Sequence, residues 1–194
     1  MKNVLVTGAA GFLGSHLAMY HLRRGDRVLG VDDFSSSRHD SAHVRELCGW
    51  ANFTLVEHDI VRPLHESFLA RGGVLQIIYN FACPASPPFY QAMPIDTMMT
   101  CVVGTDQMLR LAKSTGAVMV QASTSEVYGD PDHSPQEEGY RGCVNSYGPR
   151  SCYDEGKRAA EALCFDYRNK EKVDARLVRI FNTYGPHMDP YDGR

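Results

Sequence analysis

"VTGAAGFLGSH", residues 6–16, gives the first indication of how this chain folds. Gly8, Gly11 and Gly14 are spaced as G-x-x-G-x-x-G between an apolar stretch and an amphipathic stretch that Gly25 ends. Glycines in this spacing permit a tight turn, and the N-terminus of a following helix offers unpaired N–H groups and a positive dipole end to a phosphate. The segment therefore predicts a strand, a phosphate-binding turn and a helix.

The rest of the chain alternates short apolar stretches with longer helical patterns. We expect strands at residues 3–7, 27–32, 53–59, 74–82, 118–123 and 174–180. We expect helices at residues 12–25, about 42–48, 95–114 and 153–170, with a Pro-rich loop at 83–94. Strands that alternate with helices indicate a parallel sheet covered on both faces. The pattern predicts an α/β fold, a Rossmann-like doubly wound parallel sheet.

The length of 194 residues fits one substantial domain and the start of another. We expect residues 1–180 to form a dinucleotide-binding domain. Residues 181–194 form a loop after the last strand, so we expect them to begin a substrate-binding region whose remainder lies beyond Arg194.

Composition argues against several classes of function. Lys and Arg total 20, Asp and Glu total 23, and the net charge of −3 does not suit a nucleic-acid partner. No apolar run approaches ~18 residues, so we expect no membrane span. Six cysteines without a C-x-x-C pair and without a signal peptide indicate reduced thiols and a cytoplasmic protein. His39 and His43, with Asp40 between them, have metal-ligand spacing, but a solvated polar segment is the preferred interpretation, so we expect no metal.

The carboxyl ends of the predicted strands supply the candidate cofactor ligands. Asp32 ends the second strand, where a carboxylate accepts both hydroxyls of an adenosine ribose and repels a 2′-phosphate. This favours NAD over NADP; Arg38 is an opposing signal, and the alternative is that Asp32 only caps a turn. The residues expected to contact the cofactor are Gly8, Gly11, Phe12, Leu13, Gly14, Asp32, Asp33, Asp59, Ile60, Phe81, Ala82, Cys83, Ser123, Tyr153 and Lys157.

Tyr153 and Lys157 lie one helical turn apart. A free phenol has a pKa near ~10, and a neighbouring ammonium together with a nicotinamide cation favours the phenolate. Such a tyrosine can remove a proton from a hydroxyl whose carbon is being oxidised, and Thr124 or Ser123 can orient that hydroxyl. The alternative is an ordinary surface pair. Gly156, in mid-helix, indicates the close approach of a neighbouring segment.

Four motifs in order carry a family resemblance. The glycine turn with Asp32, "STSEVYGDP" (residues 123–131), "SCYDEGKR" (residues 151–158) and "RIFNTYGP" (residues 179–186) resemble the extended short-chain dehydrogenases/reductases that act on nucleotide sugars. With "ACPASPP" (residues 82–88), they are most similar to the UDP-glucuronate decarboxylase subfamily, which makes UDP-xylose.

The resemblance implies a reaction and further residues. In this subfamily NAD⁺ oxidises C4 of UDP-glucuronate, with the residue matching Tyr153 as base. The C4 ketone then allows carbon dioxide to leave, and the cofactor is recycled. Thr124, Glu126, Tyr153 and Lys157 match the catalytic positions. Thr100 matches a cofactor contact, and the substrate contacts match Ser125, Glu126, Asn182, Thr183 and Arg194. The helices at 95–114 and 153–170 resemble the pair of helices that forms a four-helix dimer interface in this family, which implies a homodimer.

Glu126 separates this subfamily from its relatives. Related 4,6-dehydratases carry an Asp–Glu pair, and here Ser125 replaces the Asp, while a 4-epimerase would lack the glutamate. A solvated loop carboxylate is the alternative interpretation of Glu126. The resemblance also implies that a later part of the protein supplies most of the sugar pocket and an arginine that works with the glutamate.

Some positions depart from the family pattern. Asn80, Met99, Cys101 and His187 stand where the family has His, Lys, Asn and Arg, and Asp33 replaces an Asn. A related dehydratase or epimerase therefore stays open as an alternative, as does a non-catalytic module that binds NAD or dimerises.

Overall fold

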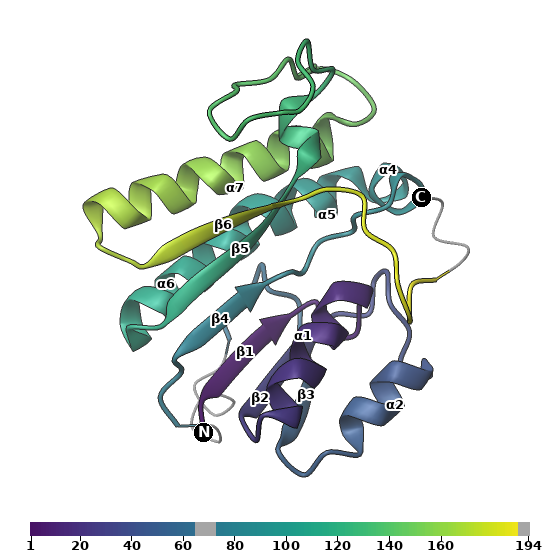
Figure 1. The fold of residues 1–194 in the computed structure, drawn as a ribbon, viewed down its shortest axis with the longest axis vertical. Helices are drawn as coiled ribbons and strands as arrows, with labels where there is room; N and C mark the ends of the chain where they lie inside the picture. The colour runs from purple at the N-terminus through teal and green to yellow at the C-terminus, as the bar shows by residue number, and fades with distance from the viewer. Residues whose placement is uncertain (65–72, 190–194) are drawn as a thin grey trace.

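Six parallel strands form one sheet in the order β3-β2-β1-β4-β5-β6 (Figure 1). The structure, a computed structural model, describes residues 1–64 and 73–189. The strands are β1 (Asn3–Thr7), β2 (Arg27–Asp32), β3 (Phe53–Glu57), β4 (Ile77–Asn80), β5 (Val118–Thr124) and β6 (Ala175–Ile180). The chain moves outward from β1 to β3, then returns to the other side of β1 at β4 and moves outward again. This order confirms the predicted doubly wound sheet and puts its topological switch point between β1 and β4.

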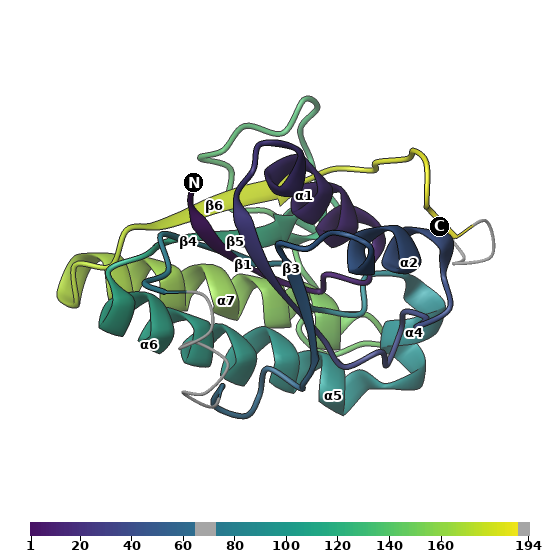
Figure 2. The same cartoon turned by 90° about the horizontal axis from the view of Figure 1, so that it is seen from below.

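Helices cover the two faces of the sheet (Figure 2). One face carries α1 (Phe12–Arg23) and α2 (Ala42–Cys48), and the other carries α6 (Thr105–Thr115) and α7 (Ser151–Lys170). Alternate residues of a strand point to opposite faces. Along β1, Val4 and Val6 accordingly join the core beneath α1, whereas Leu5 joins the core beneath α6 and α7.

The segment between β4 and β5 differs from the prediction in two places. The Pro-rich stretch predicted as a loop contains the short helix α4 (Pro87–Ala92), which prolines begin because their fixed φ suits the first turn. The long helix predicted at 95–114 is divided into α5 (Pro94–Met99), a π-helical turn η1 (Thr100–Gly104) and α6. Periodicity cannot reveal the π turn, because a single wide turn barely shifts the pattern of buried positions.

Close packing at Gly104 accompanies the π turn. A Cβ added to Gly104 would lie 2.6 Å from Cδ1 of Ile60, which follows β3. The wide turn thus sits tightly against the carboxyl ends of the strands. It brings Thr100 to the cavity described below and buries Cys101 against α7.

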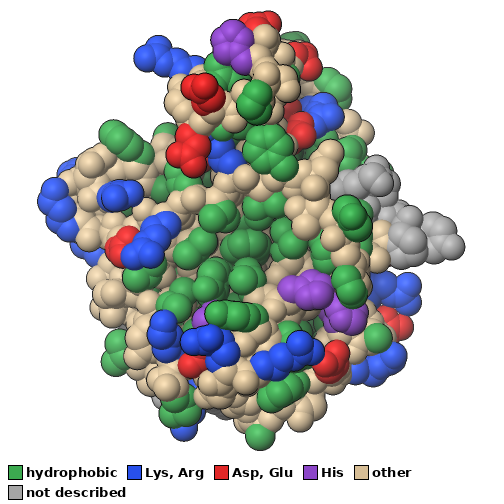
Figure 3. Space-filling view, in the orientation of Figure 1, with side chains coloured by type: hydrophobic (Ala, Val, Ile, Leu, Met, Phe, Trp, Pro, Cys, Tyr) green, Lys and Arg blue, Asp and Glu red, His purple; other side chains and the backbone are tan. Residues whose placement is uncertain are grey.

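The face that carries α1 and α2 is partly uncovered over β5 and β6. Figure 3 shows hydrophobic side chains gathered at the centre of the view, over the part of the sheet that β4, β5 and β6 form in Figure 1. Val178 of β6 is 39% exposed, and Phe181, directly after β6, is 49% exposed. Parallel sheets normally bury both faces, so this hydrophobic area is suited to covering by a further element.

None of the helices in the two described ranges has the length and apolarity needed to cross a bilayer.

Candidate active site

The glycine turn holds β1, α1 and the end of β4 in close contact. Gly8 has φ +68°, and a Cβ there would lie 2.8 Å from the carbonyl oxygen of Phe81. A Cβ on Gly14 would lie 2.0 Å from the carbonyl oxygen of Gly8. The N-cap of α1 is Gly11, which provides no side-chain cap, and the first turn of α1 carries no acid. The backbone N–H groups at the start of α1 are therefore suited to an anion.

An open cavity lies at the switch point, beyond the carboxyl ends of the strands. It contains about 520 Å³ of empty space, including its open mouth. Ten of the residues predicted to bind a cofactor line it: Gly8, Gly11, Asp32, Asp33, Asp59, Ile60, Phe81, Ala82, Cys83 and Thr100. Phe12, Leu13 and Gly14 form the adjacent first turn of α1. The predicted residues therefore come together from four strand ends and from η1.

Asp32 both caps a turn and lines this cavity. Its carboxylate accepts hydrogen bonds from the backbone N–H of Ala10 (2.9 Å), the backbone N–H of Phe34 (3.0 Å) and the hydroxyl of Ser37 (2.7 Å). Burial raises the pKa of Asp32, and these three hydrogen bonds oppose that rise. A carboxylate has about four acceptor positions, so one remains for a ribose hydroxyl. The glycine turn, the helix terminus and this acid fit a dinucleotide.

Tyr153 and Lys157 are buried side chains of α7, which rules out the ordinary surface pair. Tyr153 is 6% exposed and Lys157 is 4% exposed. The Tyr153 ring stacks on Tyr90 with ring centroids 5.0 Å apart. Nζ of Lys157 lies 5.7 Å from the centre of the Tyr153 ring and donates to the carbonyl oxygen of Ala122 at 3.0 Å.

Burial and charge act against each other in this pair. Burial raises the pKa of Tyr153, and the Lys157 ammonium lowers it but does not fully offset burial, so the pKa stays above its usual value. Burial alone would lower the pKa of Lys157, but the neighbouring Cys83, Cys101 and Tyr153 raise it. Lys157 therefore remains a cation, and its effect on Tyr153 has the predicted direction.

The close approach predicted at Gly156 is confirmed. A Cβ on Gly156 would lie 3.0 Å from Cβ and 3.2 Å from Sγ of Cys101. The glycine lets η1 pack directly on α7. This contact links the cavity wall to the helix that carries Tyr153 and Lys157.

Thr124 and Glu126 are placed by a short 3₁₀ turn, η2 (Ser125–Tyr128). Oγ1 of Thr124 accepts the backbone N–H of Glu126 at 3.2 Å. The carboxylate of Glu126 forms a salt bridge with Arg150, which precedes α7, and its side chain is 35% exposed, so it is a paired and partly solvated carboxylate. The resemblance implied an arginine from a later part of the protein. Arg150 was not predicted as the partner of Glu126, because residues 24 positions apart form no local pattern.

Behind Arg150 lies Asp154, whose Oδ2 is 3.8 Å from Nε of that arginine. Burial raises the pKa of Asp154 to about 6, against the lowering effect of Arg150. The three side chains form a charged row from η2 to the first turns of α7.

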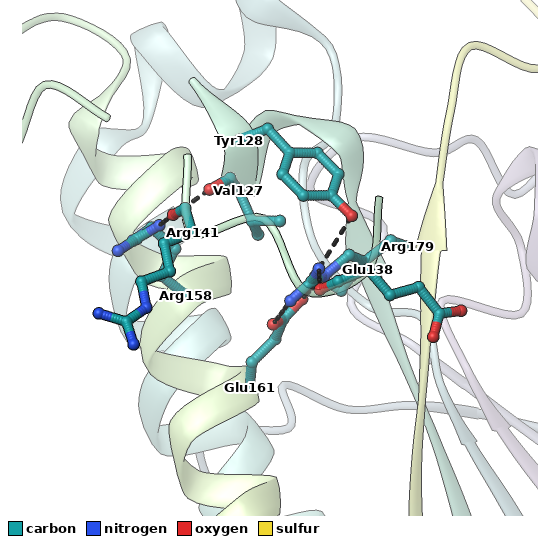
Figure 4. A network of polar contacts seen from close by, with 8 residues as sticks. Val127, Tyr128, Glu138, Arg141, Arg158, Glu161 and Arg179 are labelled. Carbon is teal, nitrogen blue, oxygen red and sulfur yellow. Dashed lines mark hydrogen bonds and ion pairs between the residues drawn. The ribbon is translucent and has the colours of Figure 1, made fainter. Parts of the chain in front are cut away.

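A second polar network fixes η2 and the loop that follows it (Figure 4). The guanidinium of Arg179 in β6 donates to both carboxylate oxygens of Glu161 in α7, at 2.9 and 2.7 Å, and to the hydroxyl of Tyr128 at 2.9 Å. Arg158 donates to the carbonyl oxygens of Val127 and Arg141, each at 2.9 Å. These bonds hold the turn that carries Glu126 against α7.

Replacing Glu161 with glutamine tests this network. At pH 7 we expect the free energy of unfolding to fall by about 2 kcal/mol, because Arg179 loses its charged partner in a mostly buried setting. Burial raises the pKa of Glu161, but hydrogen bonds from Arg179 and Ser123 hold it below its usual value. The stabilisation is therefore complete above the ordinary glutamate pKa, about 4.3, and is lost as the pH falls through the lower folded value.

Urea unfolding of the protein and the variant between pH 7 and pH 3 measures this difference. Glu155→Gln is the matched control, since Glu155 pairs with Arg158 at 3.6 Å near the surface of the same helix. We expect that control to lose no more than about 0.5 kcal/mol. An unfolding difference for Glu161→Gln that stays constant down to pH 3 would contradict the assignment.

A buried polar network inside the sheet also escaped sequence analysis. Thr7 donates to Oδ1 of Asn80 at 2.8 Å, and Nδ2 of Asn80 donates to Oε1 of Gln121 at 2.8 Å. Oγ1 of Thr7 also accepts the backbone N–H groups of Phe81 and Ala82, at 3.0 and 3.1 Å. The network fixes the cavity wall after β4. Polar residues inside apolar strands were the signal in the sequence.

The remaining predicted residues that the structure describes do not line the cavity. The hydroxyl of Ser123 donates to Glu161 at 2.5 Å, because Ser123 points to the α7 face of β5. The structure therefore does not support Ser123 as the residue that orients a substrate hydroxyl; Thr124 is better placed. Asn182 and Thr183 are exposed after β6. Arg194 lies outside the described residues, and Ser125 begins η2.

His39 and His43, considered as metal ligands, make contacts with different parts of the structure. His39 stacks on Phe34 and lies 3.5 Å from Glu57, whereas Nε2 of His43 is 2.8 Å from the carbonyl oxygen of Ala10. Among the described residues, no group of three or more His, Cys, Asp or Glu is arranged to hold a metal ion.

Comparisons with known proteins point to one family. A family profile described as GDP-mannose 4,6 dehydratase matches residues 5–191. UDP-glucuronic acid decarboxylase 1 of Xenopus tropicalis is 49% identical over 193 residues, covering 100% of this chain and 44% of that protein. UDP-glucuronic acid decarboxylase 4 of Arabidopsis thaliana is also 49% identical, covering 98% of this chain and 41% of that protein. The chain thus spans less than half of these relatives.

Solved structures agree with the fold. The dTDP-glucose 4,6-dehydratase from Bacillus anthracis, solved in complex with NAD, superposes with a TM-score of 0.80 at 29% identity, covering 98% of this chain and 58% of that one.

Proposed function

The chain belongs to the GDP-mannose 4,6-dehydratase family, and from that premise we propose that it is the cofactor-binding part of an NAD-dependent UDP-glucuronate decarboxylase that forms UDP-xylose. One observation carries the proposal: Cys83 lines the dinucleotide cavity and also packs against Tyr153, so the Tyr–Lys pair adjoins the cavity. The 49% identity to curated decarboxylases selects the reaction within the family.

The residues of the cavity are suited to hold NAD⁺. The start of α1 and the glycine turn would bind the diphosphate, and Asp32 the adenosine ribose. Asp32 disfavours a 2′-phosphate, which supports NAD over NADP. When bound, the cofactor supplies reversible oxidation of the substrate hydroxyl carbon.

Tyr153 acts as the base for the C4 hydroxyl of the sugar. The Tyr153 hydroxyl lies in a buried setting, in which the Lys157 ammonium favours the phenolate. The hydroxyl of Thr124 forms a hydrogen bond with it. Because a phenol is protonated at neutral pH and burial raises the pKa of Tyr153 further, proton removal depends on the positive charge that Lys157 provides. Ser125, Asn182, Thr183 and Arg194 are proposed to contact the nucleotide sugar.

Glu126 favours decarboxylation over the alternatives. Its carboxylate is oriented by Arg150, and Ser125 occupies the position where dehydratases carry an acid. Loss of carbon dioxide needs no proton donor for a leaving hydroxide, so a serine suffices there. The likeness to a 4,6-dehydratase structure keeps dehydration as the second candidate.

Product analysis distinguishes these reactions. The full-length protein is incubated with UDP-glucuronate and NAD⁺, and UDP-xylose and carbon dioxide are the expected products. Incubation with UDP-glucose and dTDP-glucose tests for epimerase and dehydratase activity. NAD⁺ binding without UDP-xylose formation would overturn the decarboxylase proposal, and the non-catalytic module would be favoured if UDP-glucose and dTDP-glucose were not converted either.

We also propose that residues 181–194 begin a substrate-binding region. Support comes from the greater length of the relatives and from the hydrophobic face over β5 and β6, which a following segment can cover (Figure 3).

A homodimer through α5 and α7 is proposed as well. Ile95 is 76% exposed and Met99 is 45% exposed on α5, and Phe165 is 66% exposed on α7. Burying such side chains against a second copy stabilises association. We expect Ile95→Asp to shift the protein toward monomer in sedimentation velocity. Val74→Asp, at a 68% exposed position outside these helices, is the control. A monomeric parent protein, or an Ile95→Asp dimer of unchanged stability, would contradict this interface.

The cytoplasmic location remains a proposal, supported by the content of six free cysteines. Subcellular fractionation of the source cells tests it.

A further inference from the structure

Two thiols meet at the wall of the cavity. Cys83, which follows β4, and Cys101, which lies in η1, have sulfur atoms 3.3 Å apart. Cys83 is partly exposed and lines the cavity, whereas Cys101 is buried. The two residues are 18 positions apart and come from separate elements. The fold therefore creates a dithiol with one accessible member and one buried member.

The packing around the pair restricts its movement. Gly156 leaves room for Cys101 directly against α7, with Sγ 3.2 Å from the position that a Cβ would occupy. Cys83 packs against the buried cluster of Tyr90, Cys152 and Tyr153. The two sulfur atoms are thus held in contact from both sides, and a bond between them requires closure from 3.3 Å to about 2.05 Å.

The charges that face the pair favour a thiolate at Cys83. The groups around it are the Cys101 thiol from η1 and, from α7, the Lys157 ammonium, the Tyr153 phenol and the Cys152 thiol. A hydrogen bond from Cys101 and the charge of Lys157 lower the pKa of Cys83 to about 7, against the effect of burial. The same hydrogen bond and burial raise the pKa of Cys101. Thiolate character is what makes a cysteine reactive toward oxidants.

We propose that Cys83 and Cys101 form a redox-active dithiol site that hydroperoxides oxidise reversibly to a disulfide. The Cys83 thiolate, which has given its proton to solvent, attacks one oxygen of hydrogen peroxide, breaks the O–O bond and becomes a sulfenic acid. The hydroxide that leaves takes up a proton from solvent and becomes water. The Cys101 sulfur then attacks the Cys83 sulfur and displaces the hydroxyl group, which leaves as water with the proton of the Cys101 thiol. Two thiols and one peroxide thus give one disulfide and two waters, and a dithiol reductant reverses the change.

Oxidation of the two thiols would change the charge next to Lys157 and the wall of the cavity. Oxidation removes the thiolate that faces the Lys157 ammonium, and it ties the end of β4 covalently to η1. Because Cys83 lines the cavity, a bound dinucleotide covers it and slows its oxidation. This last expectation rests on the proposed function, whereas disulfide formation itself does not.

Mass spectrometry of the oxidised protein tests the proposal. The reduced protein is freed of reductant, treated with one equivalent of hydrogen peroxide at pH 7 and alkylated. No Lys or Arg lies between the two cysteines, so trypsin leaves both on one peptide, which should lose two hydrogens and resist alkylation. Cleavage after Phe89 and Tyr90 separates the halves only after treatment with dithiothreitol.

The other cysteines provide internal controls. Cys48 and Cys143 are exposed, and burial raises the pKa of Cys164 to about 12. We expect Cys48, Cys143 and Cys164 to remain reduced thiols while Cys83 and Cys101 form the disulfide. In Cys101→Ser, a sulfenic acid at Cys83 should be trapped by dimedone, and Cys143→Ser should still form the disulfide.

The pH dependence gives a further measure. The oxidation rate of Cys83 should rise about tenfold between pH 6 and pH 8 and then level off, whereas a thiol with a pKa of about 8.5 continues to gain rate. Recovery of both cysteines as thiols while Cys48 or Cys143 oxidises would overturn the proposal, as would a Cys83–Cys152 bridge. A disulfide that forms equally fast with saturating NAD⁺ leaves the dithiol site standing and counts against the placement of the cofactor.

Discussion

Tyr153→Phe is expected to lower the rate of UDP-xylose formation by the full-length protein about 10²- to 10⁴-fold, the usual contribution of a positioned proton acceptor. Phenylalanine keeps the ring that stacks on Tyr90, so the buried cluster of Tyr90, Cys152 and Tyr153 remains filled. NAD⁺ affinity should therefore change by no more than about twofold, which corresponds to about 0.4 kcal/mol. Measured rates and NAD⁺ titrations of the same preparation separate the two effects.

Two further variants sharpen this test. Tyr147→Phe, at a side chain that is 95% exposed, should retain full activity. In Lys157→Met the pKa of Tyr153 should rise further, because the ammonium that lowers it is absent, so the acidic limb of the pH–rate profile should move to higher pH. Undiminished product formation by Tyr153→Phe would remove Tyr153 as the base.

Gly14→Ala should both destabilise the protein and weaken dinucleotide binding. The new Cβ would lie 2.0 Å from the carbonyl oxygen and 2.7 Å from the carbonyl carbon of Gly8, both backbone atoms that cannot rotate away. Alanine gains about 1 kcal/mol of helix propensity over glycine, but overpacking typically costs about 1–3 kcal/mol and more when backbone must move. We expect the free energy of unfolding to fall by about 2 kcal/mol or more.

Dinucleotide binding should weaken together with stability. Relieving the contact moves α1 away from the turn, and its N-terminal N–H groups no longer converge with the turn on one anion. NAD⁺ affinity should fall at least about tenfold, or ~1.4 kcal/mol. Gly139→Ala is the control, since nothing lies within 4 Å of its added Cβ. Urea unfolding and NAD⁺ titration measure both effects, and a Gly14→Ala protein with wild-type affinity would contradict the assigned role of the turn.

The Cys83–Cys101 contact gives a structural role to Cys101, which stands where the family has an asparagine. An asparagine at position 101 would offer an amide to the active site, whereas the thiol here meets Cys83 at 3.3 Å. Asn80, another departure, joins the hydrogen-bond network that fixes the cavity wall. Both substitutions are thus accommodated by specific local contacts.

Local patterns were sufficient for the sheet and most of its helices. Alternating apolar and amphipathic stretches predicted all six described strands, with β3 and β4 shorter than expected at Phe53–Glu57 and Ile77–Asn80. The π turn and α4 were missed. In the π turn the backbone follows the packing of Gly104 on Ile60, and in α4 two prolines start a helix too short to show periodicity.

The sequence by itself determined the glycine turn, the acid at Asp32 and the Tyr153–Lys157 pair. In each of these, the relevant residues are neighbours along the chain or end successive strands, so their spacing alone places them. Tertiary structure decided the partners of Glu126, Glu161 and Cys83. Those contacts join positions 18 to 38 residues apart, and they exist only because η1, α7 and the ends of β5 and β6 pack together. Burial likewise decided the direction of the pKa shift of Tyr153. The cost of removing a charge from water depends on the surrounding atoms, which no local spacing specifies.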